Sequence, residues 1–136
     1  MDINEIKEVA IKARTIFEQH HDRISKIHFG SFPTGSCGSS SDLLAQYLLS
    51  KGVKKIKYVH GKRGRHSHGW LEIDGLIIDI AGDQFDDGVD GVYISTDRYF
   101  HDKFSPLKYN DKPGVPAVLM DPYNKFKTLM EENALS

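Results

Sequence analysis

Hydrophobic positions near the start of the chain follow a helical period. Apolar side chains recur at three- and four-residue steps at Ile3, Ile6, Val9, Ala10, Ala13, Ile16 and Phe17. This spacing predicts one amphipathic helix over residues 2–20, whose apolar face packs on a core. The charged side chains between these positions are expected to face solvent: Glu5, Glu8, Lys12 and Arg14.

A second helix is predicted after a segment rich in helix breakers. Residues 28–38 read HFGSFPTGSCG, and their three glycines and one proline favour an ordered loop. Apolar residues then return at helical spacing and stop at Gly52, so the helix begins between Ser36 and Ser40 and ends near Ser50. Cys37 therefore lies at or just before the first turn of this helix.

The hydrophobic period changes from helical to strand-like after Gly52. Alternating or β-branched runs predict strands over residues 56–60, 66–73 and 76–81, which form an antiparallel sheet. The pair Asp74-Gly75 between the last two runs predicts a two-residue hairpin turn. Farther on, the sequence predicts two short strands, a long loop or lid, and a closing helix, at residues 92–95, 115–120, 97–114 and 122–132.

Composition narrows the class of protein. The chain has 136 residues, 39% hydrophobic and 27% charged, which fits one globular domain over residues 1–136. Its net charge of -1 gives no general attraction to nucleic acid or to an anionic membrane. The N-terminal residues lack the continuous apolar run of a signal peptide or membrane span, so we expect a cytoplasmic protein. A signal-independent secretion route would leave no trace in such a sequence.

The hairpin turn makes a geometric prediction about two polar residues. A two-residue turn pairs Ile73 with Leu76, which puts Trp70 opposite Asp79. Side chains at every second position share a face, so Asp79 becomes the diagonal neighbour of His68. A three-residue turn would reverse this parity. An acid inside an apolar strand is costly unless it is paired, and His68 is the nearest candidate partner.

These residues have the chemistry of a thiol enzyme. The chain has one cysteine, which excludes an internal disulfide. At the start of a helix, the thiolate of Cys37 is favoured by the helix dipole and by unpaired backbone N–H groups. His68 can serve as the base, and Asp79 can hold its ring in one tautomer. The N–H groups of Cys37 and Gly38 can bind an oxyanion.

The same residues resemble the transglutaminase-like cysteine enzymes, a branch of the papain-like fold. Three segments between about Phe32 and Phe85 carry the resemblance: Gly35-Ser36-Cys37, His68-Gly69-Trp70 and Ile77-Ile78-Asp79. The flanking residues look like a compact bacterial or phage version of the group. The resemblance implies an α+β, papain-like or transglutaminase-like core, with a catalytic cysteine at a helix N-terminus packed on an antiparallel sheet.

The resemblance also implies roles for individual residues. Cys37 would be the nucleophile, His68 the base and Asp79 its orienting partner. The candidates for oxyanion and substrate binding are Ser36, Gly38, Gly69, Trp70 and Gln84. Gln84 is included because papain-like peptidases place a glutamine upstream of their cysteine, and none matches here. The small residue after the histidine is usually alanine in the family but is Gly69 here. No cofactor is expected, and neither a coenzyme A thioester nor calcium fits so short a chain.

The expected activity is cysteine-dependent hydrolysis of an amide bond in a protein or peptide, by a peptidase, isopeptidase or glutamine deamidase through a thioester. Transglutaminase-type transfer to an amine, and a non-catalytic binding or inhibitor module, are the alternatives. Under the predicted register His66 lies opposite Asp83, which makes these two a second candidate pair of base and orienting acid. A metal site on His66 and His68 with Asp79, joined by Cys37 or His60, is a competing interpretation.

Overall fold

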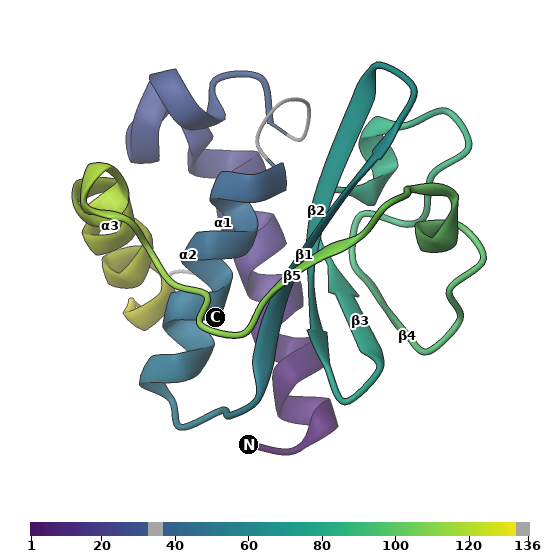
Figure 1. Cartoon of the computed structure of the whole chain (residues 1–136). Helices are drawn as coiled ribbons and strands as arrows, with labels where there is room; N and C mark the ends of the chain where they lie inside the picture. Colours follow the sequence, from purple (N-terminus) through teal and green to yellow (C-terminus); the bar gives the residue numbers. More distant parts are fainter. Residues whose placement is uncertain (33–36, 133–136) are drawn as a thin grey trace.

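The computed structural model describes residues 1–32 and 37–132, with the backbone alone at Cys37. In these residues, three α-helices pack on one face of a five-stranded antiparallel sheet, an α+β architecture (Figure 1). The elements are α1 (Ile3–Phe29), α2 (Cys37–Ser50), β1 (Ile56–Arg63), β2 (His66–Ile73), β3 (Leu76–Asp79), β4 (Tyr93–Ser95), β5 (Lys108–Asn110) and α3 (Met120–Glu131). The strands lie in the order β4-β3-β2-β1-β5.

The first predicted helix is confirmed, and it is longer than the pattern indicated. A capping box begins α1: the Asp2 carboxylate accepts the backbone N–H of Glu5 at 2.9 Å, and the Glu5 carboxylate accepts that of Asp2 at 3.2 Å. The helix runs to Phe29 with a break at Ser25, whose backbone is extended. The expectation that Arg14 faces solvent is wrong, because Arg14 is only 9% exposed and contacts the far end of β3.

The predicted hairpin between β2 and β3 is confirmed residue by residue. Ile73 pairs with Leu76, Glu72 with Ile77 and Leu71 with Ile78, around the two-residue turn Asp74-Gly75. Both turn residues have positive φ, 50° and 82°, the backbone that matches the twist of a two-residue hairpin. The parity assumed from the sequence therefore holds.

Both faces of the sheet are covered. The larger apolar core lies between the helices and the sheet, and includes Phe17, Leu44, Leu71 and Ile78. A smaller core on the other face joins strand residues to a connecting segment: Val59, Trp70, Ile77, Phe100 and Phe104. The sequence predicts a loop or lid over segment 97–114. Its Phe100 and Phe104 pack on the second face of the sheet, so this part of the segment covers that face. Figure 1 shows the chain between β4 and β5 on this side of the sheet.

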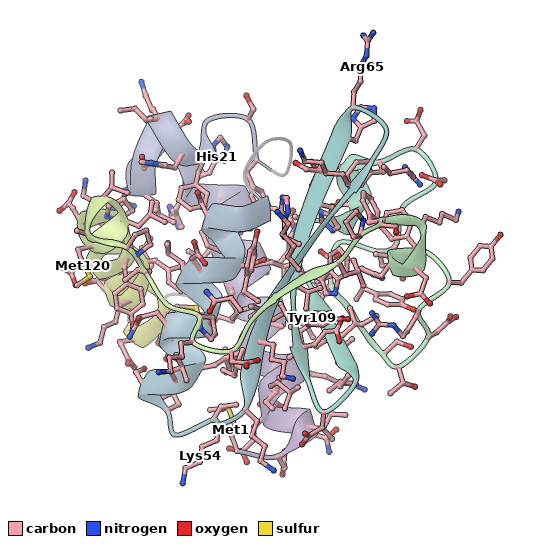
Figure 2. The ribbon with its side chains drawn as sticks, in the orientation of Figure 1. Met1, His21, Lys54, Arg65, Tyr109 and Met120 are labelled. Carbon is pink, nitrogen blue, oxygen red and sulfur yellow. The ribbon has the colours of Figure 1, made fainter. Side chains whose placement is uncertain are left out.

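Two short elements differ from the sequence prediction. The strand expected over residues 115–120 is wrong: a 3-10 turn at Ala117–Leu119 follows Pro116 and leads directly into α3. Instead, β5 at Lys108–Asn110 pairs with Tyr58–His60 at the edge of the sheet. All three of its residues are exposed, so no apolar alternation marked it. Figure 2 shows Tyr109 along this edge and Arg65 at the tip of the β1–β2 turn.

Candidate functional site

A buried histidine and a buried aspartate meet on the second face of the sheet. His68 on β2 and Asp79 at the end of β3 lie on the same face, as the hairpin register requires. His68 Nε2 is 2.6 Å from Asp79 Oδ2. The side chains are 0% and 1% exposed, so this charge-assisted hydrogen bond is shielded from water.

A second histidine shares the same carboxylate oxygen. His101, in the 3-10 turn His101–Lys103, places its Nε2 2.7 Å from Asp79 Oδ2. Its side chain is fully buried. Sequence analysis missed His101, because it lies 22 residues from Asp79 in a segment without periodicity. The only signal was an imidazole between two phenylalanines, Phe100 and Phe104, in a segment otherwise polar.

The Asp79 carboxylate is stabilised in its ionised form. Burial alone would raise the pKa of Asp79, because it removes water from the charge. The attraction of His68, the hydrogen bonds from both imidazoles, and the backbone N–H of Ala81 at 2.9 Å outweigh burial and hold the pKa of Asp79 well below its usual range. Asp79 is therefore an acceptor at both oxygens.

The neighbouring glutamine identifies the tautomer of His68. The Gln84 amide nitrogen donates to the Ala81 carbonyl at 2.9 Å, which fixes which end of the amide carries the hydrogens. This nitrogen lies 3.5 Å from His68 Nδ1. A donor facing Nδ1 and a carboxylate facing Nε2 both favour a neutral ring with its hydrogen on Nε2. Nδ1 is thus the nitrogen of His68 that can take a proton.

Aromatic side chains enclose the His68 ring. Its centroid lies 5.2 Å from that of Phe85, 5.4 Å from Trp70 and 5.6 Å from Phe104. Trp70 is itself fixed, because its indole N–H donates to Glu72 at 2.9 Å. This packing leaves the imidazole little freedom to rotate, which is what a base of defined orientation requires.

The beginning of α2 lies against β2 next to His68. A Cβ added at Gly69 would collide with the Tyr58 hydroxyl, and one added at Gly38 would lie 3.2 Å from the same hydroxyl. The Ser41 hydroxyl donates to the Gly69 carbonyl at 3.5 Å. Ser36 and the side chain of Cys37 lie outside the described residues, so the predicted contact between the thiol and His68 stays a prediction.

The close fit leaves no room for a side chain at Gly69. We expect Gly69→Ala to reduce the free energy of unfolding by about 1–3 kcal/mol, because its methyl group displaces the Tyr58 ring. Chemical denaturation measures the effect. In the Tyr58→Ala background the same substitution should cost much less, since the collision is removed. Equal costs in both backgrounds would refute this account.

The second candidate pair is not assembled. Both carboxylate oxygens of Asp83 are bound by Arg14, at 2.8 and 2.7 Å. His66 is exposed, with its ring 6.1 Å from that of Phe85. The extrapolated register fails because β3 ends at Asp79 and a 3-10 turn at Gly82–Gln84 carries Asp83 away from β2. The prediction of His66 and Asp83 as a second pair of base and orienting acid is therefore wrong.

A cavity lies beside Gln84 and Phe85, two side chains that contact His68. It measures about 400 Å³ and is lined by Arg63, His66, Gln84, Phe85, Asp86 and Asp87. Gln84 is shared between this cavity and His68 Nδ1. The Gln84 side chain therefore separates the cavity from the His68 ring.

The residues proposed for a metal site are not grouped as the sequence suggested. Among the described residues, the ligand-type atoms that converge belong to His68, Asp79 and His101, and neither His60 nor His66 joins them. A histidine that binds metal through Nε2 usually donates its Nδ1–H to an acceptor. Here Nδ1 of His68 faces an amide donor, which favours hydrogen bonding over metal binding at this cluster.

One acid on α2 titrates near neutral pH. Asp42 lies five residues after Cys37, about one and a half helical turns. Burial raises the pKa of Asp42 to about 6. The charge on the helix that carries Cys37 therefore changes in the range where a cysteine enzyme would work.

Comparisons with known proteins give no relative for this chain. No family model, curated protein or solved structure matches the chain significantly. In the described part of the chain, no helix is both long enough and apolar enough to cross a membrane.

Proposed function

We propose that this chain is a cysteine-dependent amide-bond hydrolase with a transglutaminase-like or papain-like site. Cys37 is the nucleophile, His68 the base and Asp79 its orienting acid. The observation that carries the proposal is the buried hydrogen bond of 2.6 Å between His68 Nε2 and Asp79 Oδ2. This bond leaves Nδ1 of His68 as the proton acceptor. His68 is next in the chain to Gly69, which contacts Ser41 near the start of α2.

The end of β3 supports an approach of the thiol to His68. His68 and Gly69 point to opposite faces of β2, and α2 lies on the Gly69 side. The ladder between β2 and β3 ends at Leu71 and Ile78, before it reaches His68. The side of β2 that faces away from β1 is therefore not bordered by a β3 strand at His68. The proposed reaction requires the tip of α2 to approach Nδ1 around this end of the ladder.

The reaction proceeds in two acyl-transfer steps. His68 Nδ1 takes the thiol proton, and the thiolate forms a C–S bond to the substrate carbonyl. The oxyanion is stabilised by the backbone N–H groups at the start of α2 and by the Gln84 amide hydrogen that turns away from Nδ1 when this nitrogen takes the proton. Nδ1 then gives the proton to the leaving nitrogen as the C–N bond breaks, and a thioester remains. Water, deprotonated by the same nitrogen, hydrolyses the thioester and restores the thiol.

The decisive experiment combines thiol reactivity with product analysis. Cys37 should react with iodoacetamide at pH 7 faster than free cysteine, and His68→Gln should slow it, because the base no longer stabilises the thiolate. Incubation with peptides containing glutamine or isopeptide bonds, followed by mass spectrometry, identifies deamidation, cleavage or crosslinking. Cys37→Ala should lower the rate by about 10⁴-fold or more, with an unchanged melting temperature.

The outcomes separate the three activity classes. Deamidation or cleavage supports hydrolysis, and crosslinking to an added amine supports transfer. A Cys37 that reacts no faster than free cysteine, with no product from any peptide, would contradict the proposal and favour a binding module.

A further inference from the structure

The Nδ1 atoms of His101 and His68 have different surroundings: Nδ1 of His68 faces the Gln84 amide, and Nδ1 of His101 does not. His101 Nε2 lies 2.7 Å from Asp79 Oδ2, and the centre of the His101 ring lies 4.6 Å from that of Trp70 and 5.4 Å from that of Tyr93. Its Nδ1 is buried and has no hydrogen-bond partner among the described residues. A buried N–H without an acceptor is rarer than an acceptor without a donor. His101 therefore carries its hydrogen on Nε2, pointing at the carboxylate.

Two N–H donors then converge on one carboxylate oxygen. The negative charge at Asp79 Oδ2 is divided between His68 and His101, at nearly equal distances of 2.6 and 2.7 Å. A carboxylate that is already bound by a second donor stabilises a neighbouring imidazolium less than one bound by a single donor. A proton on His101 Nδ1 would be buried without an acceptor among the described residues.

We infer that His101 is a positioning residue that shares the Asp79 carboxylate with His68 and limits how strongly that carboxylate stabilises the His68 imidazolium. Its catalytic meaning depends on the proposed function, whereas the shared hydrogen bonds do not. By holding the same oxygen of Asp79, His101 also restricts rotation of the carboxylate that His68 contacts.

The other ionisable groups around the cluster are occupied elsewhere. Glu72 on β2 pairs with Arg98 at 3.1 Å, and Arg63 on β1 pairs with Asp87 at 2.7 Å. His60 on β1 lies opposite Gly69 and stacks with Tyr58. Burial and the charges of Lys62, Lys108 and His68 lower the pKa of His60, so its charge does interact with the cluster. On β4, the Tyr93 hydroxyl donates to the Asp97 carbonyl. Beside His101, Asp102 pairs with Arg98 and Lys103 pairs with Asp87. The side chain of Cys37 is outside the described residues.

Two amide substitutions test the sharing of Asp79. In His101→Gln the amide nitrogen can occupy the position of Nε2 and still donate to Asp79, whereas in His101→Asn it is too short to reach. NMR titration of ¹⁵N-labelled histidine rings measures the protonation of His68 directly. We expect the midpoint for His68 to rise by about one pH unit in His101→Asn and to stay near the wild-type value in His101→Gln. His20→Gln, a partly exposed histidine on α1, is the matched control.

The wild-type spectrum is a test that needs no variant. His68 and His101 should both show the Nε2–H tautomer in the neutral state. An Nδ1–H tautomer at His101, or an equal His68 midpoint in the Asn and Gln variants, would overturn the inference. Zinc added to the wild type should leave both rings unchanged, and stoichiometric zinc binding with loss of both Nε2–H signals would instead make the cluster a metal site. None of these results requires turnover, so an inactive Cys37 would refute the proposed function and leave the inference about His101 standing.

Discussion

Replacing Asp79 with asparagine is expected to lower the acylation rate by about 10³–10⁴-fold. The amide has no charge to stabilise an imidazolium at His68, and its NH₂ group must face either the two imidazole N–H donors or the N–H of Ala81. The first orientation sets the NH₂ group against two N–H donors, and the second sets it against one. The same conflict should reduce the free energy of unfolding by about 2–4 kcal/mol, because buried donors lose their acceptor. Acylation kinetics and chemical denaturation at pH 7 measure the two effects.

The pH dependence of stability gives an independent check of the same substitution. Asp79 has a pKa below its usual range in the folded protein. It therefore adds to the free energy of unfolding above the pKa of the unfolded chain, about 4, and this contribution is lost as the pH falls further. Between pH 5 and pH 3 the wild type should lose more stability than Asp79→Asn. Asp90→Asn, at an exposed position, should follow the wild-type curve. Parallel curves for wild type and Asp79→Asn would show that the carboxylate is not held in its charged form.

The pairing of His68 with Asp79 was predictable because it depends on local chemistry. The sequence Asp74-Gly75 specifies a two-residue turn, and a period of two residues then decides which side chains share a face. The two residues are eleven positions apart and lie on adjacent strands. An aspartate in an otherwise apolar strand added the energetic reason to expect a partner.

The rest of the cluster was not predictable, because long-range packing decides it. His101 reaches Asp79 only after segment 97–107 has folded over the second face of the sheet, and Phe100 and Phe104 are the residues that pack there. No sequence period records such a segment. The same holds for Arg14, whose charge suggested that it faces solvent although its partners come from residues near β3. It also holds for β5, whose three residues are all exposed and so show no apolar alternation.

Arg14 connects α1 to the turn that carries Gln84. Its guanidinium donates to the Ile80 carbonyl at 2.7 Å and to both carboxylate oxygens of Asp83, and its Nε–H donates to Glu18 at 2.8 Å. The Asp83 side chain is 33% exposed, whereas that of Arg14 is 11% exposed. Replacing Arg14 should therefore reduce the free energy of unfolding more than replacing Asp83, because it leaves buried acceptors such as the Ile80 carbonyl without a donor.

We expect Arg14→Met to reduce the free energy of unfolding by about 3 kcal/mol and Asp83→Asn by about 1–2 kcal/mol. The double variant should lose less than the sum, because the two residues share one interaction. Arg23→Met, at an exposed position on α1, is the control and should change stability little. Since Asp83 precedes Gln84 in the same 3-10 turn, Arg14→Met should also reduce hydrolysis at a temperature where the variant is fully folded, with the alkylation rate of Cys37 unchanged. A loss of thiol reactivity in that folded variant would mean that Arg14 acts on the Cys37–His68 pair rather than on the oxyanion side of the site.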